Sequence, residues 1–235
     1  MKKKYSIFHS LIFSGVLAFY CSQASASVVI DGTRVIYPSD VREVTVKLTN
    51  NGKSPVLVQS WIDLGNADDM PDKVVTPFVL TPPVNRVDSG KGQTLRIRGA
   101  NTSTLRQDRE SVYWLNVLEI PAKPKEITKQ ENYLQLALRT RIKLFYRPKG
   151  LQGNPMKAPE ELVWKAKSGK ISVYNPTSYH VSLTQLTLNG KTTPADMVSP
   201  QSEVIINTNV TPGTKITAFW VNDYGATNNG DFIIN

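Results

Sequence analysis

EVTVKLTNNG, residues 43–52, is the stretch that decides the fold class of this chain. Val44, Val46 and Leu48 alternate with polar residues, which makes one face of an extended strand apolar, and Asn-Asn-Gly then favours a turn. Similar alternating or apolar segments lie further along the chain, at residues 56–61, 94–98 and 111–120. Helical spacing is nearly absent after the first residues. The pattern therefore predicts an all-β protein.

Residues 133–146 are predicted to form one long strand, which at about 3.3 Å per residue would exceed roughly 40 Å. Leu134, Leu136 and Leu138 fall on one face. The other face carries Gln135, Ala137, Arg139, Arg141 and Lys143. Two interpretations stay open: the leucines line the core of their own domain, or the strand overhangs the domain and offers them to a partner by strand addition. The cations fit the second interpretation, because charge discourages promiscuous edge pairing.

A break at Pro148-Lys149-Gly150, followed by a polar stretch, is the best candidate for a domain boundary. Beyond it, short strands are predicted at residues 162–164, 170–174, 180–188, 203–207, 215–221 and 232–234. Many short strands separated by turn residues are typical of β-sandwiches. We therefore expect two sandwich domains in tandem, at residues 27–147 and 148–235.

The first 26 residues have the pattern of a secretory signal peptide: a lysine cluster, an apolar run and the small-residue site Ala24-Ser25-Ala26. Cleavage after Ala26 would leave 209 of the 235 residues, and the loss of three lysines would lower the formal charge from +9 to +6. Cys21, the only cysteine, would be removed, and the bulky residues before it do not match a lipoprotein signal. We expect an exported protein that is stabilised by its cores and not by disulfides.

The composition gives no support for catalysis. After cleavage His180 is the only histidine, and we expect it to have a structural role within a strand. Neither a Gly-x-Ser-x-Gly motif nor a phosphate-binding Gly-rich loop occurs, and one histidine without cysteine cannot form a typical structural zinc site. The basic residues are spread along the chain. The sequence thus predicts no enzyme, no cofactor or metal, no small-molecule substrate and no nucleic-acid partner.

Four segments, taken in their order, resemble the periplasmic pilus (fimbrial) assembly chaperones. They are TRVIY at residues 33–37, DRESVYWLNVLEIP at 108–121, IKLFYRP at 142–148 and NDYG at 222–225. The resemblance implies two immunoglobulin-like domains in an L-shaped arrangement in the periplasm. It implies an ATP-independent chaperone that completes fimbrial subunits with a donated strand and delivers them to an outer-membrane usher. Self-association of the free form stays open.

The resemblance also implies roles for individual residues. Arg34 and Lys143 would bind the C-terminal carboxylate of the subunit, because guanidinium and ammonium groups make short charge-assisted hydrogen bonds to carboxylates. The bound carboxylate would set the register in which Leu134, Leu136 and Leu138 enter the groove of the subunit. Lys143 has the opposite parity from these leucines, so either the strand twists or the clamp works from the other face.

Three more residues, Glu110, Arg147 and Asp223, would form an ion network between the domains and so hold the cleft. Residues 122–132 would be a short polar loop before the donor strand, which resembles the short-loop branch of the family that builds rod-like pili. The alternative is a structural fibre subunit or adhesin of the same fold. Against it, the mature chain has no cysteine, and residues 27–30 lead directly into the first strand without a free extension.

Overall fold

The computed structural model describes residues 27–123 and 134–235, and within these ranges the chain is all-β, as predicted. Helical structure there is limited to the short 3-10 turns η2 (Thr102–Thr104) and η3 (Ala158–Glu161). No helix in the described part of the chain is long and apolar enough to cross a membrane. The predicted signal peptide lies outside the described residues. The strands are β1 (Val28–Ile30), β2 (Arg34–Pro38), β3 (Glu43–Asn50), β4 (Val56–Asp63), β5 (Phe78–Thr81), β6 (Val84–Val87), β7 (Gly92–Gly99), β8 (Ser111–Pro121), β9 (Leu138–Arg147), β10 (Val163–Lys167), β11 (Lys170–Asn175), β12 (Ser182–Leu188), β13 (Lys191–Pro194), β14 (Ser202–Ile206), β15 (Lys215–Val221) and β16 (Thr227–Ile233).

The first sandwich packs a four-stranded sheet, β1-β3-β7-β5, against a five-stranded sheet, β2-β9-β8-β4-β6. Its paired strands are antiparallel except β2 and β9, which run parallel. The alternation in β3 places Val46 and Leu48 in the core, where they are buried. Leu115 of β8 and Leu144 of β9 belong to the same core cluster and are fully buried. In β3 the two-residue period of the sequence thus predicted which side chains face inward.

The second sandwich packs a three-stranded sheet, β10-β11-β14, against a four-stranded sheet, β13-β12-β15-β16. Ile171 and Val173 of β11 are fully buried in its core. Asn175 ends β11 and is also fully buried. Its Nδ2 donates hydrogen bonds to the carbonyl oxygens of Tyr179 and Val198, at 2.7 and 3.1 Å. Because its amide is satisfied in this way, a polar turn residue can occupy the core.

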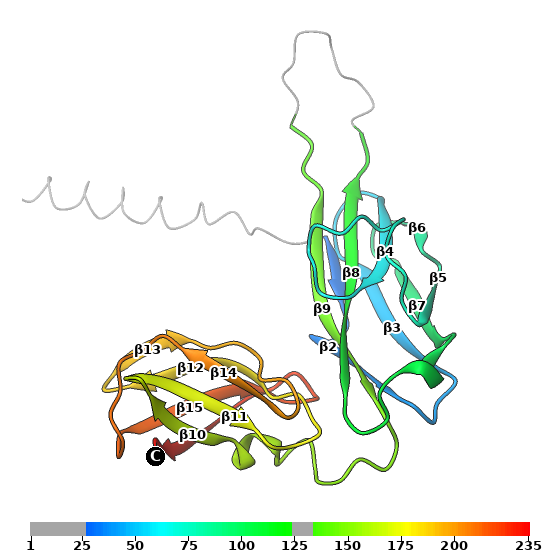
Figure 1. The fold of residues 1–235 in the computed structure, drawn as a ribbon. Helices are drawn as coiled ribbons and strands as arrows, with labels where there is room; N and C mark the ends of the chain where they lie inside the picture. The colour runs from blue at the N-terminus through cyan, green and yellow to red at the C-terminus, as the bar shows by residue number, and fades with distance from the viewer. Residues whose placement is uncertain (1–26, 124–133) are drawn as a thin grey trace, which may run out of the picture.

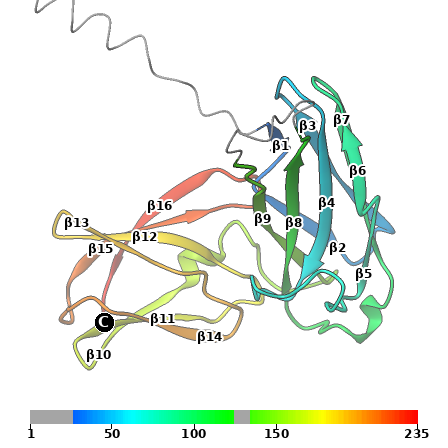
Figure 2. The same cartoon turned by 90° about the horizontal axis from the view of Figure 1, so that it is seen from above.

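The two sandwiches meet at one end, so that the molecule forms an L (Figure 1). Seen from above, the second sandwich lies on the side of β9 and extends away from β5 and β6 (Figure 2). One backbone hydrogen bond already joins the two bodies, since the Glu110 amide donates to the Ser178 carbonyl at 2.9 Å. The arrangement agrees with the L shape that the family resemblance implies.

Beyond the ends of β8 and β9 the chain continues past the sandwich as two segments, here called the ribbon (Figure 1), whereas β8 itself pairs with β4 up to Pro121. The prediction of one strand over residues 133–146 was wrong at its start, because β9 begins at Leu138. Glu119, near the end of β8, is the last residue that pairs with β9, so residues 134–137 have no strand partner; Tyr133 lies outside the described residues. Gln135 still ties this segment to β8, since its Nε2 donates to the Pro121 carbonyl at 2.7 Å.

The leucines of this ribbon are exposed. Further along β9, Ile142 and Leu144 have the same parity and are only 8% and 0% exposed, because the opposite sheet covers them. The leucines continue that row past the end of the sandwich, where the described chain offers no cover. The interpretation that they line the core of their own domain is therefore wrong. The exposed fractions of Leu134, Leu136 and Leu138 are 77%, 63% and 54%.

Most predicted strands are present with shifts of up to five residues at their ends, but the ranges of β1, β2, β5, β6 and β13 were not predicted. All five lie at the edges of their sheets. An edge strand pairs on one side only and is short, so its sequence shows little alternation. The placement of His180 in a strand was also wrong, because β12 begins at Ser182. His180 instead contacts Glu110 of the first sandwich.

The difference between covered and uncovered leucines on one strand face gives a first prediction. Replacing Leu144 with alanine should lower the free energy of unfolding by about 2–5 kcal/mol, because it leaves a cavity in a closed core. Leu136→Ala is the matched control and should change it by less than about 0.5 kcal/mol. Denaturant titration of both purified variants measures the two values. Equal destabilisation would contradict the exposure of Leu136.

Candidate functional site

Arg34 and Lys143 are direct neighbours in the sheet. Arg34 is the first residue of β2, and the parallel pairing with β9 places it opposite Lys143. Neighbouring strands lie about 4.8 Å apart, so two cations share one face of the sheet. Burial lowers the pKa of Lys143 and the charge of Arg34 lowers it further, while Asp196 acts in the opposite direction. Two partly buried positive charges at this spacing favour the approach of an anion.

Arg34 reaches from the first sandwich to the second. Its Nη1 donates to the Val221 carbonyl at 2.8 Å and to Ser182 Oγ at 3.3 Å. Its Nε is buried and has no hydrogen-bond partner among the described residues. Burial lowers the pKa of Arg34, which the charge of Asp223 partly opposes. The guanidinium is thus held in place by the second sandwich, and no hydrogen bond within the described residues uses its Nη2.

Lys143 makes no hydrogen bond or ion pair within the described ranges, and its Nζ lies 5.0 Å from the centre of the Trp114 ring. Arg141, two residues earlier on the same face, is different because its Nη2 binds the Asp63 carboxylate at 2.8 and 3.0 Å. The open donors of Lys143 and Arg34 match a planar, negatively charged acceptor. A carboxylate has this chemistry.

The edge of β9 is open next to this pair of cations. On one side β9 pairs with β8 from Leu138 to Tyr146, whereas on the other it pairs with β2 only from Lys143 to Arg147. Residues 138–142 therefore have no described strand on the β2 side, and their backbone groups can pair with an added strand. Such a strand would have to stop at Arg34, where β2 begins. The open edge and the two cations are parts of one site.

Glu110, Arg147 and Asp223 come together between the two sandwiches. Arg147 Nε donates to Glu110 Oε1 at 2.5 Å, and its Nη1 and Nη2 donate to the Asp223 carboxylate at 2.7 and 3.0 Å. The other oxygen of Glu110 accepts a hydrogen bond from the backbone amide of His180 at 2.7 Å, and His180 Nδ1 lies 3.3 Å from it. One arginine therefore connects carboxylates from both sandwiches beside the end of β9.

The charges of this network stabilise one another. Burial by itself would raise the pKa of Glu110, but hydrogen bonds from His180 and the charge of Arg147 outweigh it, and the net pKa is lowered. Burial would lower the pKa of Arg147, but the hydrogen bonds and charges of Asp223 and Glu110 outweigh it, and the net pKa is raised. Glu110 and Arg147 therefore stay ionised near neutral pH, and the network can fix the angle between the sandwiches.

Several residues of the site escaped the sequence analysis. Ser182 and the Val221 carbonyl hold Arg34, Trp114 contacts Lys143, and Asp63 holds Arg141. Trp114 does lie in the segment that resembles the family, but its own role gave no signal in the sequence. The other contacts join residues far apart in the chain, so no local spacing could have revealed them.

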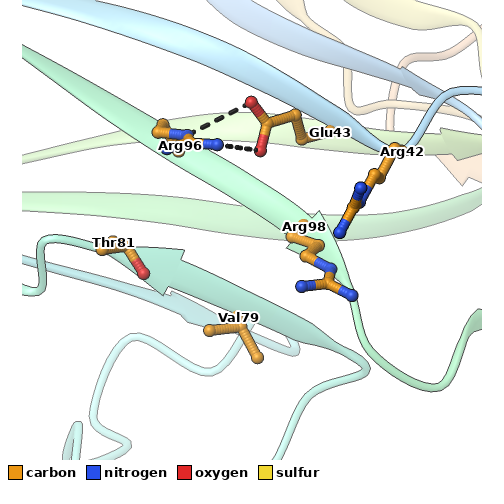
Figure 3. A pocket seen from close by; sticks show the side chains of 6 residues that line it. All are labelled: Arg42, Glu43, Val79, Thr81, Arg96 and Arg98. Carbon is orange, nitrogen blue, oxygen red and sulfur yellow. Dashed lines mark hydrogen bonds and ion pairs between the residues drawn. The ribbon is translucent and has the colours of Figure 1, made fainter.

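A hollow of about 480 Å³ lies on the sheet β1-β3-β7-β5 of the first sandwich, away from Arg34 and Lys143. Glu43 is bound there by Arg96 through two hydrogen bonds at 2.8 and 3.2 Å, and Arg42 and Arg98 also line the hollow (Figure 3). None of the residues singled out from the sequence lies in it. The lining residues are Arg42, Glu43, Val79, Thr81, Arg96 and Arg98.

Two family profiles match this chain in succession. The N-terminal domain of PapD, described as a pili and flagellar-assembly chaperone, matches residues 27–152. The C-terminal domain of the pili assembly chaperone PapD matches residues 157–232. The chaperone protein FimB/FhaD of Bordetella pertussis is 48% identical over 224 residues, which cover 90% of each chain.

Solved structures agree with these matches. The crystal structure of the YadV chaperone has 41% sequence identity and a TM-score of 0.72, over 89% of this chain and 100% of that one. A chain from the complex of the Salmonella enterica SafA pilin with the SafB chaperone has 26% identity and a TM-score of 0.77, over 91% of this chain and 99% of that one. This chain belongs to the family of PapD-like pilus assembly chaperones.

Proposed function

We propose that this chain is an ATP-independent periplasmic chaperone that binds fimbrial subunits by donor-strand complementation and delivers them to an outer-membrane usher. The observation that carries the proposal is the open edge of β9, with exposed leucines at one end and Arg34 and Lys143 at the other. The structure of the SafB relative with a pilin supports a fimbrial subunit as the partner. Binding alone suffices for this activity, so no catalytic step is required.

The proposed clamp implies a direction for the subunit strand. A strand that pairs with residues 138–142 of β9 and ends at the two cations has its C-terminus beside Lys143, so it runs parallel to β9. Its terminal carboxylate would accept hydrogen bonds from Lys143 Nζ and from Nη2 of Arg34, which makes no hydrogen bond within the described residues. Because strand pairing has a period of two, fixing the carboxylate fixes which subunit residues lie next to each leucine.

The leucines supply apolar contact area that the free chain leaves in water. Each leucine buried in a subunit groove contributes about 1.5–3 kcal/mol, and the backbone hydrogen bonds of the added strand contribute further. Association also costs free energy, because rotational and translational freedom is lost, and this cost is of similar size. A subunit therefore binds firmly only if leucines, edge and carboxylate are engaged together, which favours subunits with an incomplete sandwich.

Two further parts of the proposal concern the context. The first 26 residues would direct export and be removed, and the loop at residues 122–132, most of which lies outside the described residues, would place the chain in the short-loop branch that builds rod-like pili. Without a subunit, the open edge of β9 could instead pair with a second copy of this chain. Such self-association would protect the leucines until a subunit competes.

Charge reversal tests the clamp. Lys143→Glu should reduce the recovery of a one-to-one chaperone–subunit complex from periplasm by more than about tenfold, because a carboxylate beside the subunit's terminus repels it. Lys47→Glu, an exposed change on the other sheet of the same sandwich, is the control and should leave recovery unchanged. Melting temperatures verify that both variants fold. Normal recovery with Lys143→Glu would refute the carboxylate clamp.

The leucines have their own test. Leu136→Asp should weaken subunit capture by more than about tenfold without lowering the melting temperature, because a charge cannot enter an apolar groove at low cost. Leu64 is 62% exposed, against 63% for Leu136, and Leu64→Asp serves as the control for a surface leucine outside the ribbon. Isothermal titration with a purified subunit compares the variants. If both substitutions weaken binding equally, the ribbon has no special role.

The interdomain network should respond to acid. Glu110 has a native pKa below its usual value of 4.5, so its contribution to stability is full above that pH and disappears as pH falls through the native pKa. Glu110→Gln should lower stability at neutral pH by about 1–3 kcal/mol. The difference in melting temperature between the wild type and Glu110→Gln should shrink from about pH 6 to about pH 3. A constant difference across this range would contradict an ionised Glu110.

A further inference from the structure

Trp114 contacts two cations on the sheet face that carries Lys143, here called the cleft face. Arg141 has a carboxylate partner, whereas Lys143 has none among the described residues. Trp114 lies directly opposite Lys143 in the pairing of β8 with β9. The centre of its ring is 5.0 Å from Lys143 Nζ and 4.8 Å from Arg141 Cζ. Both distances are within the range of cation–π attraction, which is strongest for tryptophan among the aromatic side chains.

The ring itself is held by a buried ion pair. Asp63, whose side chain is 1% exposed, accepts two hydrogen bonds from Arg141 Nη2 at 2.8 and 3.0 Å and a third from Asn116 Nδ2 at 2.7 Å. The charge of Arg141 is therefore balanced by Asp63, and its guanidinium is fixed where it contacts Trp114. The contact with an immobile guanidinium limits how the indole can move.

The turn after β4 closes another side of the ring. Gly65 has a φ of +116°, and a Cβ built on it would come within 3.3 Å of Trp114 Nε1. Its amide donates to Asp63 Oδ1 at 2.7 Å, so the turn is tied to the same carboxylate that fixes Arg141. A glycine is favoured here by both the backbone angle and the close approach to the indole.

We propose that Trp114 is a positioning residue for the carboxylate clamp: its ring holds the ammonium of Lys143 at the end of the β9 edge without neutralising its charge. An acidic partner in its place would orient Lys143 equally well but would consume the charge that the subunit terminus needs. The face of an aromatic ring attracts the cation and leaves all three N–H donors available. This inference rests on the proposed binding of a subunit carboxylate.

Removing the Trp114 ring should reduce the preference for a terminal carboxylate but should hardly affect the pairing of the added strand with β9. Lysine has a long flexible stem, so without the ring its ammonium samples more positions and binds the carboxylate less often in the right one. The leucines and the open edge of β9 are untouched by this change. Trp114 should thus matter for a ligand that ends in a carboxylate and matter little for the same ligand ending in an amide.

The test compares two synthetic peptides that carry the C-terminal sequence of the subunit co-purifying with this chain, one with a free carboxylate and one with a terminal carboxamide. The wild-type protein should prefer the carboxylate by about tenfold or more. Trp114→Met keeps an apolar side chain but removes the ring, and it should reduce that preference by about threefold to thirtyfold. Isothermal titration gives the ratio of the two dissociation constants for each variant.

Trp61→Met is the matched control, because Trp61 lies on the same face and contacts Arg139 at 5.9 Å, away from the clamp. It should leave the ratio unchanged. In a Lys143→Met background, Trp114→Met should have no further effect on the ratio, since the positioned ammonium is gone. Should Trp114→Met fail to fold, Trp114→Phe decides the matter. Its smaller ring should give an intermediate ratio.

The outcomes separate the two claims. If the wild type binds both peptides equally, the carboxylate clamp of the proposed function is wrong. If the wild type prefers the carboxylate but the Trp114 variants keep the wild-type ratio, the clamp stands and the positioning role of Trp114 is overturned. A fall in affinity for both peptides by the same factor would also overturn it, because that result is expected of a merely structural residue.

Discussion

The proposed function of this chain depends on one constraint in the sheet, namely that β2 covers only part of the edge of β9. The chain passes from one sheet of the first sandwich to the other between β1, which pairs with β3, and β2, which pairs with β9. Because that crossing ends at Arg34, the pairing with β9 starts at Lys143. Everything on β9 before this point is an open edge. The same crossing therefore creates the place for an added strand and puts a cation at its end.

The second sandwich takes part in this site although it contributes no edge to it. Arg34 is held by Ser182 and by the Val221 carbonyl, and Asp223, two residues further on, binds Arg147. Neighbouring contacts thus determine both the angle between the sandwiches and the position of the Arg34 guanidinium. A buried ion network adds little net stability in general, but it does orient what it joins. In the proposed clamp, the role of the second sandwich is therefore to position Arg34.

Charge on the cleft face is divided between cations that are satisfied within the chain and cations that are not. Arg141 binds Asp63, and Arg147 binds Glu110 and Asp223, so their charges are used internally. Arg34 and Lys143 have no carboxylate partner among the described residues. Desolvation and mutual repulsion raise the free energy of these two in the free state, and the attraction of an incoming carboxylate would offset both costs. The proposed clamp therefore favours a chain terminus over an internal extended segment.

By itself, the sequence determined the all-β class, most strand positions and the common face of Leu134, Leu136 and Leu138, because the two-residue period is a local property. The resemblance to a family named the charged residues of the site. Only the tertiary structure decided that the leucines are uncovered, because periodicity is the same for a strand inside a sandwich and beyond its end. It also decided the contacts of Trp114 and Ser182, since pairing between distant strands depends on register and packing that no local spacing encodes.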